Sequence, residues 1–545
     1  MKKLKKVIVA SLAFIMAFAL VGCGGDKGGS AKTLYSNGGP QEFFETPWLN
    51  PGTFMYNKVL YSRLIVADEK LNPIEGDKDA LAKSYTYSAD GKKLTFELRD
   101  DIYWHDGEKI TGEDVKWSIE YASKTAVLNA VFKSTFSAIA GSEGGKAATF
   151  SGIKVDGNKI EINFEKVAPD ALLTFTQFAP LPKKHLENVD PLKLQQDKYF
   201  QSPVGSGPFK VDKVQMKDYA SLAPFDKYYN GVAKFNITLT SSPGDSDPNF
   251  VNNAKSGKLD FGYTKSVADI KALKGDDKIS TTPVNVRYTR LFYVNKFPNK
   301  KNGKVSPLAN EKVRQALRYG IDMETIGKNL FDGAAIPANV LIPGDDDKAT
   351  GLEAYKYNPE KAKQLLAEAK WDANTELDVV YYYTDQLTVD FMTAIQDNLK
   401  TIGVKMKFRL VEGDLASLLW KAPADQTKGP AAVDWDMCYA AVAALSLHEY
   451  YDRYRTGSLS NSHTPADAKL NELIDATNKS PKPEDQLAAF KELSKYESTT
   501  MFSIPLYYQP IYVVSSKKVE GNVDLNKLGN PQFCYNWNIQ NWELK

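Results

Sequence analysis

Hydrophobic residues occupy every second position in two short segments of the first third of the chain, 94–98 and 160–164. This period of two is typical of strands that bury one face. Between the two segments, Thr111 and Asp114 precede apolar residues at helical spacing, which predicts a helix that begins there. Residues 60–190 are therefore expected to form an α+β unit.

Strand and helix patterns alternate through the rest of the chain. Segments rich in Pro and Gly at 180–184 and 203–208 interrupt the pattern and mark a junction between domains. Asp322 can cap one helix, and Asn358 followed by Pro359 is well placed to begin another. The other patterns predict strands at 209–211, 290–295, 377–383 and 404–410, a β-rich end at 504–514, and helical segments at 313–317, 394–399, 470–476 and 484–496. Such alternation favours packed α/β layers.

The first 23 residues have the pattern of a lipoprotein signal peptide. Lysines at positions 2, 3, 5 and 6 precede the apolar run 7–21, which is too short to be a comfortable membrane span. The segment Leu20-Val21-Gly22-Cys23 resembles the lipobox of bacterial lipoproteins, whose cysteine is acylated, as with palmitate, and becomes the first mature residue. We expect a signal peptide at 1–22, a lipid anchor at Cys23 and a flexible, Gly-rich tether at 23–30. An uncleaved anchor helix, or cleavage elsewhere, is the alternative.

A lipid anchor would hold the mature protein outside the cytoplasm. It would lie on the outer face of the cytoplasmic membrane, or in the periplasm if the cell has an outer membrane. Cys438 and Cys534 could pair in such a compartment, or lie apart as buried thiols.

Composition narrows the class of protein. About 520 residues follow the tether, so two or three domains are expected. The formal net charge is only +2, and no long block of like charge suggests a nucleic-acid partner. The chain contains 29 Tyr, 26 Phe and 8 Trp, which suits either an aromatic cleft or the core.

Catalytic and metal-binding patterns are not found in the sequence. His105, His185, His448 and His463 lack the close spacing of metal ligands. The serine of Gly205-Ser206-Gly207 lacks the spacing of a nucleophile elbow, and a tight turn explains its glycines better. There is no Gly-x4-Gly-Lys phosphate loop, so ATP chemistry would belong to another polypeptide. We expect no enzyme, metal site or cofactor, while a surface enzyme or a ligand sensor remains the alternative class.

A block of motifs then resembles a known family. It comprises Leu81-Ala82-Lys83-Ser84-Tyr85, the stretch from Ser88 to Arg99, Tyr103-Trp104-His105-Asp106-Gly107 and Thr111-Gly112-Glu113-Asp114-Val115. This block resembles the characteristic segment of the family 5 extracellular solute-binding proteins, the oligopeptide- and dipeptide-binding components of ABC importers. Further similar segments follow in the same order, at 203–209, 310–317, 333–337, 357–362 and 402–404.

The resemblance implies an α/β fold with two lobes, the type II clamshell of periplasmic binding proteins, with an additional α+β domain inserted in lobe one. Lobe one would combine 31–58, 190–285 and 508–545, the additional domain would be 59–189, and lobe two would be 286–507, with hinges near 285 and 507. Ligand would close the lobes, and the closed monomer would deliver it to the permease subunits of an ABC importer.

The resemblance also implies where ligand binds. In peptide-binding members the ligand backbone pairs with strand edges, which here would be Ser36, Asn37, Gly38 and Gly39 of lobe one and Tyr439, Ala440, Ala441, Val442 and Ala443 of lobe two. Aromatic pockets would be lined by Tyr288, Tyr381, Tyr383 and Trp420.

One position departs from the family pattern. Typical peptide binders carry a Gly-Trp pair and then an aspartate for the peptide's amino group, whereas this sequence has Ala441-Val442 and Leu445 there. Glu42, Glu45 and Glu449 are the alternative carboxylates. Two ligand classes stay open: a peptide held by backbone contacts, or an oligosaccharide stacked on Tyr and Trp rings.

Overall fold

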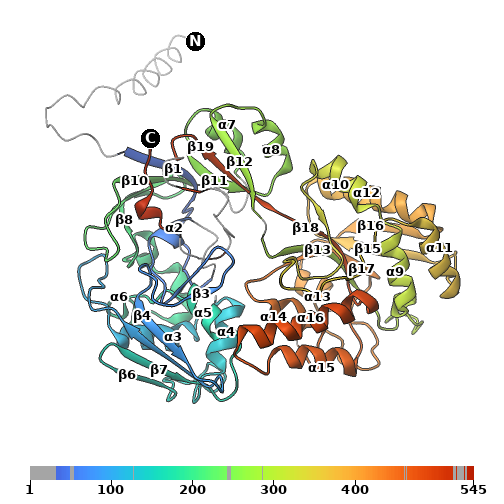
Figure 1. The fold of residues 1–545 in the computed structure, drawn as a ribbon, viewed down its shortest axis with the longest axis horizontal. Helices are drawn as coiled ribbons and strands as arrows, with labels where there is room; N and C mark the ends of the chain where they lie inside the picture. The colour runs from blue at the N-terminus through green and yellow to red at the C-terminus, as the bar shows by residue number, and fades with distance from the viewer. Residues whose placement is uncertain are drawn as a thin grey trace, which may run out of the picture. The chain divides into compact units, whose positions relative to one another are not determined.

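Two large β-sheets, a four-stranded sheet and a two-stranded ribbon organise the part of the chain that the structure, a computed structural model, describes (Figure 1). The described residues are 32–49, 55–126, 128–241, 247–284, 286–458, 461, 463–519, 523–524, 533 and 537–545. Cys23, with the predicted signal peptide and tether, lies outside these ranges, and so does Cys534.

The seven-stranded sheet defines lobe one. Its strands lie in the order β12 (Ile279–Val284), β19 (Ile511–Ser516), β11 (Phe261–Thr264), β1 (Lys32–Gly39), β10 (Phe235–Ser241), β9 (Tyr219–Pro224) and β8 (Phe209–Gln215). β1 runs parallel to β11, whereas β8, β9 and β10 form an antiparallel meander. The helices of this lobe are α2 (Met55–Val59), α7 (Phe250–Lys255) and α8 (Val267–Leu273).

The six-stranded sheet defines lobe two. Its order is β14 (Ile336–Pro337), β18 (Ile504–Tyr508), β13 (Tyr288–Val294), β17 (Met437–Ala443), β15 (Glu376–Tyr381) and β16 (Lys405–Leu410). β15 is parallel to β16 and β17, while β13 is antiparallel to β17 and β18. The sheet therefore mixes both kinds of pairing.

Helices cover both faces of this sheet with separate apolar cores. Successive strand residues point to opposite faces, so Phe292 and Tyr439 belong to one core and Leu291 and Ala440 to the other. The first core includes α9 (Glu311–Tyr319), α10 (Met323–Phe331), α11 (Pro359–Glu368) and α12 (Gln386–Thr401). The second includes α13 (Leu415–Leu419), α14 (Leu447–Tyr451), α15 (Ala468–Thr477) and α16 (Pro483–Thr500).

The four-stranded sheet belongs to the extra domain, which is inserted in lobe one. Its order is β4 (Ala82–Tyr87), β5 (Lys93–Leu98), β7 (Lys159–Asn163) and β6 (Ile153–Asp156). The domain also contains β2 (Val66–Ala67), β3 (Pro73–Ile74), α3 (Gly112–Ala122), α4 (Ala130–Ser137), α5 (Ala171–Gln177) and α6 (Lys183–Leu186). Short 3₁₀ turns elsewhere in the chain lie at Pro191–Gln196, Lys198–Gln201, Pro307–Ala309, Asp452–Tyr454 and Ile539–Asn541.

Local sequence chemistry explains where these elements begin. The predicted strands at 94–98 and 160–164 are present, with their alternating apolar residues buried. Thr111 and Asp114 form a capping box at the start of α3. The Asp322 carboxylate accepts from the Thr325 amide at the start of α10, which confirms the predicted cap.

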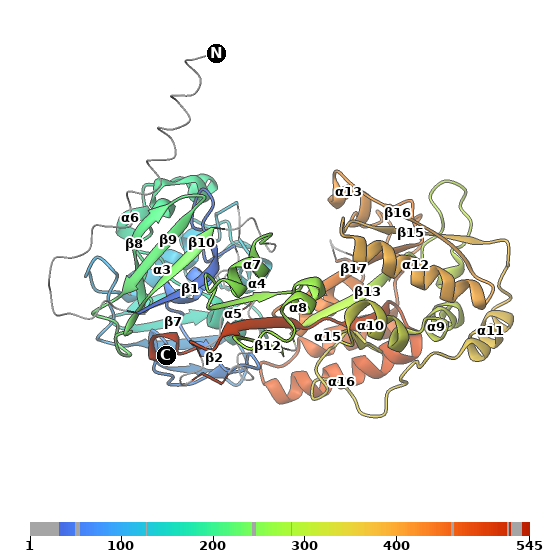
Figure 2. The same ribbon diagram turned by 90° about the horizontal axis from the view of Figure 1, so that it is seen from above.

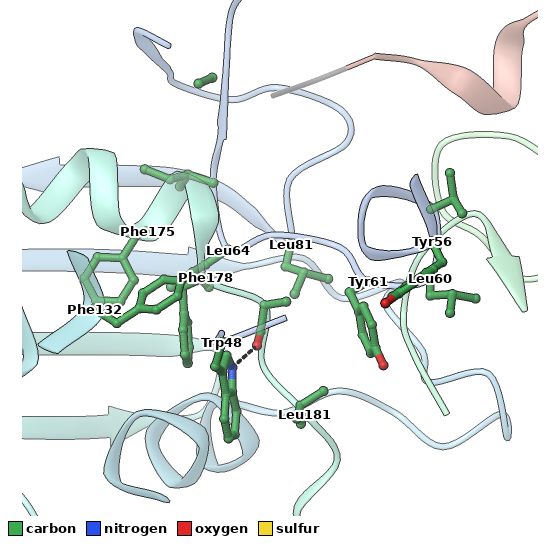
Figure 3. Close-up of a cluster of buried hydrophobic side chains, with 14 of the residues drawn as sticks. Trp48, Tyr56, Leu60, Tyr61, Leu64, Leu81, Phe132, Phe175, Phe178 and Leu181 are labelled. Carbon is green, nitrogen blue, oxygen red and sulfur yellow. Dashed lines mark hydrogen bonds between the residues drawn. The ribbon is translucent and has the colours of Figure 1, made fainter. Parts of the chain in front are cut away.

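The extra domain shares one core with lobe one. Trp48 lies in this core beside Phe178, with ring centroids 6.2 Å apart and nearly parallel planes (Figure 3). Its indole Nε1 donates a hydrogen bond to the Ala179 carbonyl oxygen at 2.8 Å. Because one continuous apolar cluster joins them, separating the two parts would expose large aromatic rings to water.

The chain passes between the two large sheets at two connections. β12 leads into β13 around residue 286, and β18 leads into β19 around 509–510 (Figures 1 and 2). The two connections lie side by side because β12 pairs with β19 and β13 pairs with β18. The hinges expected near 285 and 507 adjoin these connections, and their action as hinges is proposed below.

The Gly205-Ser206-Gly207 turn packs directly against backbone. The amides of Ser206 and Gly207 both donate to the Leu60 carbonyl oxygen at 2.9 Å. A β-carbon on Gly205 would lie only 1.9 Å from that oxygen, so the position requires glycine. Ser206 is buried and accepts from the Ser62 amide, which supports the predicted turn.

Candidate functional site

The strand β17 has an open edge in the middle of lobe two. Its pairing with β15 ends where Tyr381 faces Tyr439. Its pairing with β13 on the other side continues to Ala443, opposite Tyr288. Residues 440–443 thus have a partner strand on one side only among the described strand pairs. Unpaired N–H and C=O groups of such an edge are a template for an added strand.

Three predicted site residues surround one side chain that the sequence analysis missed. The Arg290 guanidinium carbon lies 4.2 Å from the ring centre of Tyr383, 5.2 Å from that of Tyr288 and 5.6 Å from that of Tyr439. Arg290 pairs with Ala441 in the β13–β17 register, so it lies beside the open edge. A charged residue two positions after Tyr288, on the same strand face, was the available sequence signal.

A second aromatic group lies on the other side of the end of β15. The ring of Trp420 is 5.3 Å from that of Tyr293 and 6.3 Å from that of Tyr382. Arg453 donates to the Tyr293 hydroxyl at 2.9 Å. The hydroxyls of Tyr382 and Tyr383 are 3.0 Å apart and connect the two groups.

Several predicted residues lie in the cores. Tyr381, Ala440 and Val442 are buried, as is Tyr439, whose hydroxyl lies 2.9 Å from that of Tyr507. By contrast, Ala443 is exposed, and the half-buried residues are Tyr288, Tyr383, Trp420 and Ala441. The accessible part of the candidate site is therefore made of these five side chains and the edge of β17.

The lobe-one segment 36–39 lies at the end of β1. Ser36 is buried, pairs with Phe261 of β11, and its carbonyl oxygen accepts from the Thr240 hydroxyl at 3.3 Å. Gly39 lies against β10, because a β-carbon there would come within 2.8 Å of the Leu239 oxygen. Asn37 and Gly38 are half-buried, so they are the accessible part of this segment.

Leu445 does not present a polar group at the position of the family's aspartate. Its side chain is buried in the core of lobe one and the extra domain, and its carbonyl oxygen accepts from Arg287 at 2.6 Å. Of the alternative carboxylates, Glu42 is exposed and paired with Lys217 at 3.1 Å. Glu449 caps α14, accepting from the Ser446 amide at 3.4 Å, and burial raises its pKa to about 7.

Glu45, the third alternative carboxylate, lies in lobe one and is held there through its backbone. The backbone amide of Glu45 donates to the Tyr56 hydroxyl at 3.1 Å in lobe one. The contacts described for Glu42, Glu45 and Glu449 are therefore with Lys217, Tyr56 and Ser446.

A polar contact joins the extra domain to lobe two near Leu445. Asp170, before α5, accepts from the Ser446 hydroxyl and from His448 Nδ1, both at 2.8 Å. Gln486 donates to the Pro169 carbonyl oxygen at 3.2 Å. Burial lowers the pKa of His448, but the charge of Asp170, the hydrogen bonds to Asp170 and Thr477 and the charge of Glu449 together raise it above its ordinary value. Burial raises the pKa of Asp170, but the charge and hydrogen bond of His448, the Ser446 hydroxyl and the charge of Arg287 together lower it below its ordinary value.

The described residues contain no group of three His, Cys, Asp or Glu side chains that could hold a metal ion. Burial lowers the pKa of His105 and of His463 to about 4, and each imidazole Nε2 donates to a backbone carbonyl. His185 faces Asp106 at 2.8 Å. Cys438 is a free, buried thiol. No described helix is long and apolar enough to cross a membrane.

One pocket lies away from the β17 edge, between the extra domain and the C-terminal segment. It is lined by residues that include Arg63, Asp79 and Gln540. The Asp79 carboxylate there accepts from Tyr228, Asn230 and Gln540. Because these bonds join distant segments, we interpret Asp79 as a structural centre.

These features define a two-lobed binding protein whose accessible aromatic and backbone groups gather beside one strand edge. The model of the bacterial extracellular solute-binding proteins, family 5, matches residues 78–462, and the chain belongs to that family.

Known relatives extend the match along the chain. A Brucella ovis protein named as an ABC transporter peptide-binding protein is 28% identical over 373 residues, which are 67% of this chain and 66% of the relative, slightly under two thirds. The oligopeptide-binding protein AppA of Bacillus subtilis is 27% identical over 496 residues, 83% of each chain.

Solved structures share the fold. AppA from Clostridium difficile has a TM-score of 0.77 at 19% identity and covers 95% of this chain and 100% of its own. Bacillus subtilis AppA in complex with a nonapeptide has a TM-score of 0.66 at 21% identity, covering 94% and 98%. The two-lobed type II fold is therefore confirmed.

Replacing Asp170 with Asn should lower the Tm more at about pH 5.5 than at about pH 9. The raised pKa of His448 gives stability that is complete below its ordinary value of 6.5 and is lost as pH rises through the raised value. The lowered pKa of Asp170 gives stability that is complete above 3.8 and is lost on further acidification. Between these limits the contact should contribute ~1–3 kcal/mol to the free energy of unfolding. Calorimetry at both pH values can measure this contribution.

The matched control is Asp106→Asn, which removes the half-exposed pair with His185 inside the extra domain. The charges of Arg287 and Glu449 also act on the Asp170–His448 pair. Burial raises the pKa of Glu449 to about 7, so its ionisation must be followed in the same titration. A difference in Tm that does not change with pH would contradict the role assigned to His448.

Proposed function

We propose that this protein is the substrate-binding lipoprotein of an ABC importer and that it captures peptides. The single observation that carries the proposal is the open edge of β17 at 440–443. A peptide in extended conformation would pair with it through backbone hydrogen bonds, which are the same for every sequence. The accessible rings of Tyr288, Tyr383 and Trp420 would contact its side chains.

The relatives support this ligand class. Members of the family that match this chain are named as peptide-binding proteins, and one solved structure of the same fold holds a nonapeptide. We assign no catalytic step, since the family consists of solute-binding proteins. The ATP-driven step would belong to the importer's other subunits.

Capture would work by closing the two lobes. The two side-by-side connections would allow the lobes to rotate, with Leu445 of lobe two moving against the core of lobe one. We propose lobe one at 31–58, 190–285 and 508–545, the extra domain at 59–189 and lobe two at 286–507. Ligand that touches both lobes favours the closed form, and the permease would bind that form.

A lipid on Cys23 would keep this monomer at the membrane. The lipobox and the Gly-rich segment after it are the sequence features that support an anchor and a tether. Anchoring raises the concentration of the binding protein near its permease.

Replacing Ala441 with Trp should weaken peptide binding by about tenfold or more, or ~1.4 kcal/mol. The residue is half-buried within the open stretch of β17, so an indole there would crowd the side chains of a strand that pairs with this edge. Calorimetry with peptides identified by native mass spectrometry of the purified protein would measure the loss. Ala367→Trp, at an exposed position of α11, is the control. If mass spectrometry found only glycans or other non-peptide ligands, peptide capture would be wrong.

Saturating ligand should reduce the radius of gyration measured by X-ray scattering. Rotation about the two connections brings the lobes together around the ligand, whereas a rigid protein would keep its dimensions. An unchanged radius with ligand demonstrably bound would argue against closure.

Cys23→Ser should release the protein from the membrane fraction and abolish incorporation of an alkyne-labelled fatty acid. The thiol is the predicted acylation site, so its loss removes the lipid, whereas an uncleaved anchor helix at 7–21 would keep the variant in the membrane fraction. Cys438→Ser, at the buried free thiol of β17, is the control and should keep the label. Labelling of the Cys23 variant would refute the anchor.

A further inference from the structure

Arg290 is a cation without a carboxylate partner at the edge of the candidate site. No ion pair to it is found among the described residues, and its nearest groups are the rings of Tyr383, Tyr288 and Tyr439. Its Nε donates to the Gln509 side-chain oxygen at 2.8 Å. Its Nη1 is buried and has no hydrogen-bond acceptor.

Two other arginines of lobe two show what a structural arginine looks like in this fold. The guanidinium of Arg314 donates to the carbonyl oxygens of Leu308, Ala309, Thr500 and Met501. That of Arg318 donates to the carbonyls of Ala338, Tyr355 and Pro505. Burying a charged donor is unfavourable unless it is bonded, and Nη1 of Arg290 therefore remains available to an acceptor from outside the chain.

The position of Arg290 fits an acceptor on the ligand. Arg290 pairs with Ala441, inside the open stretch of β17. It lies just after the first lobe connection, and Gln509 belongs to the second. The rings of Tyr288, Tyr383 and Tyr439 form a cage around Arg290. The ammonium group of Lys265 of lobe one lies 5.4 Å from the centre of the Tyr288 ring, so a second cation lies beside this cage.

The three rings around Arg290 differ in their exposure. Tyr288 and Tyr383 are half-buried, whereas Tyr439 is buried and its hydroxyl is bonded to that of Tyr507. The two half-buried rings form the accessible side of this group, from which an acceptor would approach the guanidinium. A tyrosine ring attracts the cation through its face and yields to a stronger, charged acceptor.

We propose that Arg290 binds a carboxylate of the ligand and that the site thereby selects ligands with a negative group. The family's aspartate for a ligand's ammonium group is replaced by Leu445 in this chain. The inference rests on the proposed peptide function and deepens it. The carboxylate is either the C-terminus of the peptide or an Asp or Glu side chain, and both offer the same chemistry to a guanidinium.

Three pools of synthetic peptides separate these sources: free C-terminus, amidated C-terminus, and free C-terminus without Asp or Glu. Retention by the purified full-length protein is read by mass spectrometry, and the best-retained peptides are measured by calorimetry. For a C-terminal carboxylate, amidation should weaken binding by about tenfold or more. For an acidic side chain, the pool without Asp and Glu should lose binding by the same factor.

Arg290→Gln should remove whichever preference the protein shows, and Arg290→Lys should retain part of it because the charge remains. Arg409→Gln is the matched control, since this arginine lies on β16 in an ion pair with Asp378. The Arg409→Gln variant should show the same preference among the peptide pools as the unmodified protein. The pools act on the unmodified protein, so the test stands even if an Arg290 variant fails to fold. Equal binding of all three pools would overturn the inference and leave peptide capture standing, whereas retention of no peptide would overturn both.

Discussion

The two large sheets are joined through one pair of neighbouring connections, and the rest of the architecture depends on this constraint. β12 pairs with β19 over six positions in lobe one, and β13 pairs with β18 directly beyond, in lobe two. The core that lobe one shares with the extra domain also contains Leu445 of lobe two, whereas the two cores on the faces of the six-stranded sheet are made mainly by lobe two. The proposed closure would be a rotation about these two adjacent strands, and it would move Leu445 against the core of lobe one.

The extra domain packs with lobe one and also contacts lobe two. Because Trp48 and the phenylalanines around it form one core with lobe one, the extra domain must move with lobe one. Its Asp170 meets His448 of lobe two through hydrogen bonds. That contact is polar and local, whereas the contact between the extra domain and lobe one is a continuous apolar core. Polar contacts of this kind can form and break as lobes move.

The candidate site lies where these parts come together. The open edge of β17 offers backbone groups, and the rings beside it offer apolar surface with little loss of side-chain entropy. Arg290 adds a charge next to the connections, so that a group bound there would touch the segment about which the lobes turn. Binding chemistry and lobe movement would then depend on the same few strands.

Local patterns in the sequence determined the elements, because alternation, caps and Pro or Gly breaks act over a few residues. The strand at 94–98 and the caps at Thr111 and Asp322 were predictable for that reason. Motif order likewise pointed to the family. The sequence also named Tyr288 and Tyr383, although periodicity could not separate them from the buried Tyr381.

Tertiary structure alone decided which residues meet. Arg290 and Tyr439 are 149 positions apart in the chain. Only the pairing of β13 with β17 brings them together. The end of β15 at Tyr381 sets the length of the open edge, and Asp170 meets His448 across 278 residues. Pairings of this kind follow from sheet order and from packing between domains, which depend on the whole chain and not on any local run of residues.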